Sequence, residues 1–366
     1  MKKIKVSLKD RSYGIFIGRG ALRELPRVIR RSGFRGPVVI LTDPVVSSNT
    51  SRLVEPMLAS LSRSHENLRI TVPSSERSKS LAVYGDTVEK IARKTQGKKP
   101  LIVALGGGVV GDLAGFIAAT FRRGVPFIQV PTTLLAQVDS SIGGKCGVDL
   151  LAAKNLIGAF YQPRAVIADV DILSSLPTRQ VRNGMAEVVK YAVIKSPALF
   201  DMLEKDMPKV ISLKGFHIEH VIYECAAIKA RIVERDERDV QDVRIILNFG
   251  HTLGHAIETA TSYSEAYNHG EAVALGMILA GDIALELGMI SLSDLERIKN
   301  LIARAGLPTR ITGVTPRKIM ESMGFDKKFT SGANRLVLPC GIGSVKIIDD
   351  IPELLIKTVL RKYVRS

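Results

Sequence analysis

Three histidines and one glutamate in the second half of the chain are residue types that form metal sites. His251 and His255 are four residues apart, so both imidazoles would lie on one face of a helix, and His269 precedes a further apolar segment. Glu187 lies in the apolar segment 183–194, where a carboxylate without a partner is costly. Two imidazoles and one carboxylate with an open coordination position suit a catalytic divalent ion. Each histidine taken alone is more often a packed or surface residue, but the set favours a metal site.

The spacing of His251 and His255 also occurs in zinc proteases, but the internal glutamate of the motif H-E-x-x-H is absent. A metalloprotease is therefore disfavoured. If residues 244–251 continue the same helix, Arg244, Asn248 and His251 project toward one region near the metal.

A glycine-rich run at 101–112 has the pattern of a buried strand followed by a turn and a helix. Gly106, Gly108 and Gly111 match G-x-G-x-x-G, in which glycines let backbone N–H groups approach a pyrophosphate at a helix N-terminus. The match alone is weak, because it lies about a hundred residues into the chain and lacks the acidic residue that follows about twenty residues later in Rossmann folds. Glycines that merely allow close packing of strand and helix are the alternative.

Polar residues after two other predicted strands favour a dinucleotide. Asp43 follows the strand 38–41, where an acid could bond ribose hydroxyls, and Thr132 and Thr133 follow the strand 127–130. Parallel sheets bind ligands at the carboxyl ends of their strands. The sequence therefore predicts a dinucleotide at this edge of a sheet.

Several cations lie inside apolar or glycine-rich segments. Most lysines in any protein are solvated, but an unpaired ammonium in such a segment is costly, and a bound phosphate or carboxylate would explain it. The set comprises Arg122, Arg123, Lys145, Lys154, Lys190, Lys229, Arg244, Lys327 and Lys328, with Asp139 and Asn155 close by in sequence. An anionic substrate is indicated.

The elements that must position these residues fall into two groups. Up to residue 177, short β-branched runs at 38–41, 101–105, 127–130 and 165–168 alternate with helical or glycine-rich segments, which is typical of βαβ units on a parallel sheet. After residue 177 strand signals nearly vanish, and apolar residues recur at helical spacing in the segments 183–194, 218–234, 250–261, 270–288 and 292–305. We expect an α/β domain at 1–177 and a mostly helical domain at 178–366, with the ligand in a cleft between them.

Length and composition exclude several protein classes. The 366 residues suffice for about two domains, and 46% hydrophobic and 24% charged residues are typical of a globular protein. The N-terminus has the pattern of a strand rather than a signal peptide, no segment has the pattern of a membrane span, and the three scattered cysteines suggest a reducing cytoplasm. The net charge of +16 admits a nucleic-acid-binding protein as a third hypothesis, but the basic residues are dispersed and aromatic residues are 5% of the chain without tryptophan.

Taken in chain order, the motifs resemble those of the 3-dehydroquinate synthase family, one of the sugar-phosphate cyclases. The resemblance runs along almost the whole chain and is carried by GGGVVGD at 106–112, PTTLLAQVDSSIGGK at 131–145, KNLIGAFYQP at 154–163, AEVVKY at 186–191, NFGHTLGHAIE at 248–258 and HGEAV at 269–273. Cys146, residues 149–153 and small insertions before Arg244 and His269 depart from the family pattern, which affects details of the substrate loop.

The resemblance implies a Rossmann-like N-terminal domain, a helical C-terminal domain and a phosphate-eliminating cyclase. Such an enzyme converts 3-deoxy-D-arabino-heptulosonate 7-phosphate into 3-dehydroquinate and phosphate in the shikimate pathway, with NAD used catalytically. Zn²⁺ or Co²⁺ would be bound by Glu187, His251 and His269. The alternative is another cyclase or a metal-dependent polyol dehydrogenase of the same superfamily.

The resemblance also assigns residues to the ligands. NAD would contact Asp43, Ser74, Ser75, Glu76, Arg77, Ser78, Lys79, Gly107, Gly108, Val109, Val110, Gly111, Asp112, Thr132, Thr133, Lys145, Lys154, Ile172, Leu173, Ser174 and Ser175. The substrate phosphate would contact Lys145, Asn155, Lys327 or Lys328, and Arg123 from a second subunit, which implies a homodimer. The catalytic residues would be Asp139, Lys145, Lys190, Lys229, Arg244, Asn248 and His255, with Arg244 on the substrate carboxylate.

Overall fold

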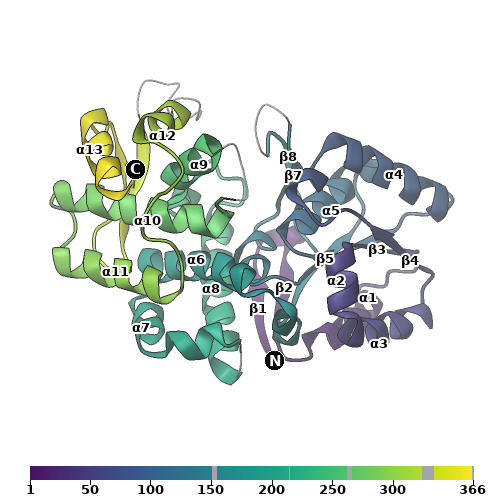
Figure 1. Cartoon of the computed structure of the whole chain (residues 1–366). Helices are drawn as coiled ribbons and strands as arrows, with labels where there is room; N and C mark the ends of the chain where they lie inside the picture. Colours follow the sequence, from purple (N-terminus) through teal and green to yellow (C-terminus); the bar gives the residue numbers. More distant parts are fainter. Residues whose placement is uncertain (151–154, 214, 262–265, 324–333, 365–366) are drawn as a thin grey trace. The chain divides into compact units, whose positions relative to one another are not determined.

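The structure is a computed structural model that describes residues 1–150, 155–213, 215–261, 266–323 and 334–364. It divides by internal contacts into two units, one made of Met1–Pro177 with Ile218–Arg238 and the other of Thr178–His217 with Asp239–Ser366. Figure 1 shows the helices and strands of each unit.

The first unit is built on a seven-stranded sheet in the order β1-β2-β9-β6-β5-β3-β4. The strands are β1 (Lys2–Val6), β2 (Tyr13–Gly18), β3 (Val38–Thr42), β4 (Asn67–Thr71), β5 (Leu101–Gly106), β6 (Phe127–Pro131) and β9 (Ala165–Asp169). All neighbours are parallel except the edge strand β1, which is antiparallel to β2. The strands expected at the N-terminus and at 38–41, 101–105, 127–130 and 165–168 are confirmed.

Helices cover both faces of this sheet, which explains why its central strands are apolar at nearly every position. On one face Ile40 packs in a core with α1 (Leu25–Arg31) and α3 (Ser51–Ser62). On the other face its neighbour Leu41 packs in a core with α4 (Leu81–Thr95) and α5 (Gly108–Thr120). Successive strand residues point to opposite faces, and the fold is therefore the expected α/β arrangement.

The remaining elements of the first unit include the short helix α2 (Pro44–Asn49) and a hairpin of β7 (Lys145–Val148) and β8 (Ile157–Phe160) that sequence patterns did not predict. Helix α8 (Gly215–Arg235) also belongs here for most of its length. The N–H of Ser7 donates to Glu234 Oε1 at 2.6 Å, and Lys2 Nζ lies 4.7 Å from the centre of the Tyr223 ring. The division after Pro177 coincides with the expected boundary, but the helix at 218–234 packs on the first strands, a long-range pairing that local patterns do not reveal.

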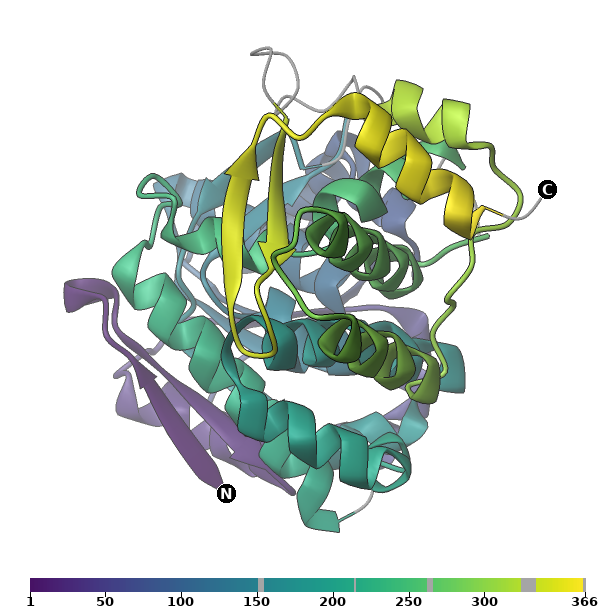
Figure 2. The same cartoon turned by 90° about the vertical axis from the view of Figure 1, so that its left-hand side faces the viewer.

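The second unit is mostly helical, as expected. Its helices are α6 (Thr178–Lys195), α7 (Pro197–Ile211), α9 (His251–Ala260), α10 (His269–Glu286), α11 (Leu292–Arg304), α12 (Pro316–Met323) and α13 (Glu353–Tyr363). It also contains one antiparallel hairpin, β10 (Arg335–Pro339) with β11 (Val345–Asp349), which Figure 2 shows beside the ends of α10 and α11. The sequence patterns did not predict this hairpin, whose two strands are five residues long each.

Cross-links and membrane segments were both disfavoured by sequence. All three cysteines are free, and Cys146 and Cys225 are buried. Within the part of the chain that the structure describes, every helix is too short or too polar to cross a lipid bilayer.

Candidate active site

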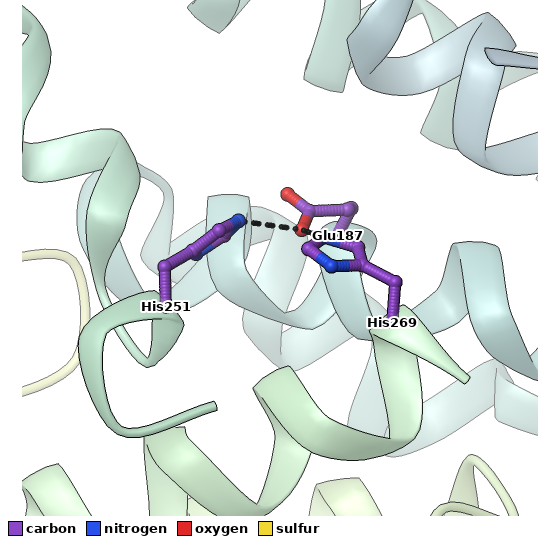
Figure 3. A group of neighbouring side chains, drawn as sticks. All are labelled: Glu187, His251 and His269. Carbon is purple, nitrogen blue, oxygen red and sulfur yellow. Dashed lines mark ion pairs between the residues drawn. The ribbon is translucent and has the colours of Figure 1, made fainter. Parts of the chain in front are cut away.

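Three helices of the second unit bring Glu187, His251 and His269 together. Glu187 is buried in the middle of α6, His251 is the first residue of α9, and His269 is the first residue of α10. His251 Nε2 lies 3.3 Å and His269 Nε2 lies 3.6 Å from the same oxygen, Glu187 Oε1. One donor atom from each residue lies within 4.8 Å of the others, and the three side chains point toward one another in Figure 3.

The chemistry of this group fits a divalent metal ion. Both Glu187 oxygens are buried, and neither accepts a hydrogen bond from a described residue. Lys190, three residues further along α6, forms an ion pair with Oε2. His251 Nδ1 lies 3.1 Å from the carbonyl oxygen of Phe249, which leaves Nε2 directed at the carboxylate. This carboxylate, already paired with one cation, and the two imidazoles that face its Oε1 are together the donor types that a divalent metal binds.

The protonation states also suit metal binding. Burial alone would raise the pKa of Glu187, but Lys190 and His251 hold it well below its ordinary value, so the carboxylate is ionised. Burial lowers the pKa of His251, which keeps its imidazole neutral. Burial would also lower the pKa of His269, but Glu187 and Glu258 raise it to about 10, so a metal must displace a proton from this ring.

Close backbone contacts fix the three helices. A Cβ at Gly270 would overlap the carbonyl oxygen of Asn183 on α6, and a Cβ at Gly276 would overlap the carbonyl oxygen of Gly250 before α9. The N–H of Gly270 also donates to Asn183 Oδ1 at 2.7 Å. Asn183 lies four residues before Glu187 on the same helix, so this bond ties the start of α10 directly to the helix that carries the carboxylate.

The first turn of α10 is capped by two reciprocal hydrogen bonds between Asn268 and Glu271. The N–H of Glu271 donates to Asn268 Oδ1 at 2.9 Å, and the N–H of Asn268 donates to Glu271 Oε2 at 2.9 Å. Arg179 of α6 donates to both Glu271 oxygens, at 3.0 and 2.8 Å. This capping box orients His269, the residue that directly follows the N-cap.

The third histidine belongs to a second possible metal group. His255 is exposed, and its ring centre lies 5.6 Å from that of His251 and 5.9 Å from that of His269. His255, Glu258 and His269 also place one donor atom each within 4.8 Å of the others. The two groups share His269, so the geometry keeps both ligand sets open, and the convergence of two imidazoles on the buried Glu187 carboxylate favours the first.

The segment before α9 is not the continuous helix considered for residues 244–251. A 3₁₀-helix, Val243–Asn248, is followed by Phe249 with ψ of 123° and by Gly250 with φ of 78°, and α9 begins only after them. Arg244 is buried and Asn248 is half-buried. The expectation that helical spacing aligns Arg244, Asn248 and His251 is therefore wrong, because Gly250 adopts a left-handed backbone conformation that interrupts the helix.

Two further residues expected to be catalytic lie together in the first unit. Asp139 lies in a π-helix, Ala136–Ser140, a form of helix often found at functional sites. Lys229 of α8 lies with its Nζ 2.9 Å from Asp139 Oδ2, and it also donates to the Asp139 carbonyl oxygen at 2.8 Å. Lys229 is 6% exposed and the Asp139 side chain is 23% exposed, so the lysine end of this ion pair is buried and the carboxylate end is half-buried.

The expected nucleotide residues lie at the carboxyl ends of three neighbouring strands. Asp43 follows β3, Gly107 follows β5 and Thr132 follows β6. From β3 the chain forms β4 on one side and β5 on the other, so the strand order reverses at β3 and β5, where such sheets bind ligands. Gly107 is the N-cap of α5 and makes no side-chain cap bond, and the buried Oγ1 of Thr132 has no hydrogen-bond partner among the described residues.

The acid after β3 already has two partners. Asp43 Oδ1 accepts a hydrogen bond from the N–H of Val46 at 3.0 Å and from the hydroxyl of Ser74 at 2.9 Å. The Asp43 carboxylate therefore caps α2 and orders the loop that starts at Ser74, and Ser75, Glu76 and Arg77 in this loop are exposed.

Lys79 is the centre of a buried polar cluster beside the glycine loop. Its Nζ lies 2.9 Å from Asp112 Oδ2 and 2.6 Å from Asn155 Oδ1. Burial would lower the pKa of Lys79, but Asp112 and Glu76 raise it, and burial raises the pKa of Asp112. Asn155, expected at the substrate phosphate, thus contacts a residue expected at the nucleotide.

The side chains of some residues expected at the nucleotide point into the protein. Ser78 is buried and its hydroxyl donates to the Pro73 carbonyl oxygen at 2.5 Å. The side chains of Val110 and Ile172 lie in the two cores of the sheet, and Leu173 is also fully buried. Gly108 and Val109 at the start of α5, Gly111, Thr133, Ser174 and Ser175 complete the expected set, and all of them except Gly111 are at least partly exposed.

The expected phosphate contacts are only partly described. Lys145 on β7 and Arg123 are exposed, whereas Lys154, Lys327 and Lys328 lie outside the described residues. Arg122 and Arg123 have φ of 50° and 62°, and Gly124 follows with φ of 118°. Consecutive left-handed residues that are not glycine are unfavourable, and such backbone strain occurs often at ligand sites.

Residues that sequence reasoning missed are Asn183, Glu258 and the capping pair Asn268 and Glu271. The capping pair has a recognisable spacing, because a polar N-cap is followed three residues later by glutamate. Glu258 also has a signal, because it lies seven residues after His251 and therefore two turns along the same helical face.

Comparison with known proteins gives one consistent family. The sequence model described as 3-dehydroquinate synthase N-terminal matches residues 69–183, and the one described as 3-dehydroquinate synthase C-terminal matches residues 184–329. The 3-dehydroquinate synthase of Pelobacter propionicus is 43% identical over 97% of this chain and 98% of its own length. That of Desulforamulus reducens is 44% identical over 98% of this chain and 99% of its own.

Solved structures of enzymes with other names have the same fold. A 2-deoxy-scyllo-inosose synthase complexed with carbaglucose-6-phosphate, NAD⁺ and Co²⁺ has a TM-score of 0.87 at 27% identity, covering 99% of this chain and 100% of that chain. A 2-epi-5-epi-valiolone synthase from Streptomyces hygroscopicus with NAD⁺ and Zn²⁺ has a TM-score of 0.87 at 25% identity, covering 97% and 98%. A glycerol dehydrogenase from Schizosaccharomyces pombe, with a TM-score of 0.68 at 15% identity over 95% and 88%, shares the fold alone.

Proposed function

We propose that this chain, which belongs to the 3-dehydroquinate synthase family, converts 3-deoxy-D-arabino-heptulosonate 7-phosphate into 3-dehydroquinate and phosphate. The similarity to enzymes of that name along nearly the whole chain is the observation that carries this proposal. The activity places the enzyme in the shikimate pathway of aromatic amino acid biosynthesis, in the cytoplasm. Its first unit holds NAD⁺, and its second unit holds Zn²⁺ or Co²⁺, the cofactors present in the two cyclase structures.

The metal is assigned to Glu187, His251 and His269, and NAD⁺ to the strand ends at Asp43, Gly107 and Thr132. When bound, the metal acts as a Lewis acid on a substrate hydroxyl while NAD⁺ accepts a hydride and later returns it. The geometry of Glu187 supports this assignment, since two imidazole nitrogens converge on one oxygen of this buried carboxylate. The N-terminus of α5, with a glycine as its N-cap, supports a pyrophosphate there.

The chain's charged side chains give the substrate its orientation. The buried guanidinium of Arg244 offers a planar pair of donors to the substrate carboxylate, which a lysine would not reproduce. The substrate hydroxyls are assigned to Asp139, Lys190, Lys229, Asn248 and His255. Lys229 is fixed by its two contacts with Asp139, so this ion pair acts as one positioned unit.

The phosphate is assigned to Lys145, Asn155 and either Lys327 or Lys328, together with Arg123 from a second subunit. This assignment makes the enzyme a homodimer. Two features support it, which are the exposure of the Arg123 side chain and the strained backbone at Arg122 and Arg123.

The test is to supply the heptulosonate phosphate with NAD⁺ and a divalent metal and to follow free phosphate, cyclised product and NADH together. We expect phosphate and 3-dehydroquinate in equal amounts, with NAD⁺ needed only in catalytic quantity. Steady accumulation of NADH in proportion to substrate consumed would instead identify a metal-dependent polyol dehydrogenase. Salt-sensitive binding of nucleic acid without binding of NAD⁺ or metal would support the third hypothesis from sequence.

A further inference from the structure

His269 faces a carboxylate with each of its two ring nitrogens. Its Nε2 lies 3.6 Å from Glu187 Oε1, and its Nδ1 lies 3.6 Å from Glu258 Oε2. The two carboxylates come from different helices, α6 and α9, and both are buried. An imidazole that binds a metal through one nitrogen carries its proton on the other, so the two carboxylates must have different roles.

The buried geometry distinguishes these roles. The Glu187 oxygen also lies 3.3 Å from His251 Nε2, so both imidazoles converge on it. Glu258 faces the opposite edge of the His269 ring. The other imidazole is arranged in the same way, since His251 Nδ1 is held by the Phe249 carbonyl oxygen at 3.1 Å. Each histidine therefore has an acceptor at Nδ1 that leaves Nε2 for the metal.

We propose that Glu258 is a positioning residue of the metal centre, which accepts the Nδ1–H of His269 and thereby fixes the ring with Nε2 toward the metal. This inference rests on the proposed metal centre of Glu187, His251 and His269. The Glu258 carboxylate also adds a negative charge outside the ligand set. That charge offsets the positive end of the α10 dipole, where His269 is the first residue, and makes the imidazole a stronger donor.

The experiment compares metal-free wild type, Glu258→Gln and Glu286→Gln by competition for Zn²⁺ against a chromophoric chelator. Glu258→Gln keeps the size of the side chain and removes its charge. Glu286 is the matched control, because it lies on the same helix as His269 and forms an exposed ion pair with Lys362 at 2.6 Å. We expect Glu258→Gln to bind Zn²⁺ about 10- to 100-fold more weakly, as for other partners of metal-bound histidines, and Glu286→Gln to match wild type.

Three further readouts separate this role from a general loss of structure. The thermal unfolding of the metal-free Glu258→Gln chain should follow that of wild type, and Glu258→Asp should recover part of the lost affinity because it restores the carboxylate. The visible absorption of Co²⁺ bound to Glu258→Gln should shift, since the orientation and donor strength of His269 change.

Zn²⁺ affinity of Glu258→Gln equal to wild type would overturn the positioning role and leave the metal centre intact. Binding that is abolished by Glu258→Gln and His255→Ala but survives His251→Ala would also overturn it, because Glu258 would then be a ligand. A wild-type chain that binds neither Zn²⁺ nor Co²⁺ would overturn the proposed metal centre together with the role of Glu258.

Discussion

The two proposed binding sites use different atoms of the polypeptide. The metal cluster is the group of Glu187, His251 and His269, and the nucleotide edge is the sheet edge at Asp43, Gly107 and Thr132. In the cluster, side chains of three helices converge, and backbone contacts at Gly270 and Gly276 fix how closely those helices pack. At the nucleotide edge, the atoms proposed to bind the nucleotide are largely backbone N–H groups after β5, and the side chains of Asp43 and Lys79 already hold the surrounding loops. The metal cluster therefore depends on particular side chains, whereas the nucleotide edge depends on glycines, which leave the backbone N–H groups accessible.

Both regions contain buried side-chain oxygens that make no hydrogen bond to a described residue. In the cluster these are the Glu187 oxygens, which form ion pairs with Lys190, His251 and His269, and at the sheet edge the atom is Thr132 Oγ1. Leaving the Thr132 hydroxyl unsatisfied costs about 1–3 kcal/mol, which a ligand can recover. We therefore expect substitutions at each site to change ligand affinity and the free energy of unfolding by different amounts.

The largest effect is expected from the metal ligands. Glu187→Ala, His251→Ala and His269→Ala should each lose the ion and nearly all turnover, because two remaining ligands hold a metal poorly. His255→Ala should keep the metal. Metal analysis of the purified variants checks this, and a result in which His255 is required and His269 is dispensable would show that the ligand assignment is wrong.

Arg244→Lys tests whether the second unit also binds the substrate through a specific side chain. We expect substrate binding to weaken by about 1.5–3 kcal/mol, typical of a hydrogen bond to a charged group, because lysine lacks the planar fork. Binding of Zn²⁺ and NAD⁺ should not change. Equilibrium binding of the substrate and turnover measure the effect, and normal values for both would make Arg244 a structural residue.

Gly108→Ala tests whether the nucleotide edge needs open backbone. A Cβ at Gly108 would lie 3.1 Å from Ser140 Oγ and would stand at the N-terminus of α5. We expect NAD⁺ to bind about tenfold more weakly, or about 1.4 kcal/mol, with unchanged metal content. Gly85→Ala on α4 is the control, because a Cβ there meets no atom within 4 Å and should stabilise the helix. Equal NAD⁺ affinity in both variants would contradict a pyrophosphate site at α5.

Thr132→Val tests the unsatisfied hydroxyl at the end of β6. The variant should raise the free energy of unfolding without NAD⁺ by about 1 kcal/mol, because it removes a buried polar atom that has no partner among the described residues. The same change should weaken NAD⁺ binding. Chemical denaturation with and without NAD⁺ measures both effects, and a loss of stability in the free protein would show that the hydroxyl already has a structural role.

The smallest effect is expected at Glu271, which caps α10. Burial would raise its pKa, but Arg179 and the Asn268 N–H lower it below its ordinary value. A lowered folded-state pKa contributes stability that is present above the unfolded pKa and lost as pH falls through the folded one. At neutral pH Glu271→Gln should therefore be less stable than wild type by about 0.5–1 kcal/mol, and the two should converge in acid. A difference that stays constant with pH would contradict the assignment.

Local sequence patterns predicted the helices that carry the metal ligands, but they did not predict the backbone conformation of the segment before α9. Segment 183–194 and the spacing of His251 and His255 mark helices by themselves, so the ligand types could be found before their contacts were known. The left-handed conformation of Gly250 interrupts the helix between Arg244 and His251, and helical periodicity does not predict this interruption. At the sheet edge, the glycines are visible in sequence, but the burial of Ser78 and Ile172 follows from tertiary packing.

The most direct test of the account is the position of the metal in crystals soaked in Zn²⁺, measured by anomalous diffraction on both sides of the zinc absorption edge. We expect one peak bonded to Glu187, His251 Nε2 and His269 Nε2, at about 2.0–2.2 Å from each. A peak bonded instead to His255, Glu258 and His269 Nδ1 would contradict both the ligand assignment and the role of Glu258.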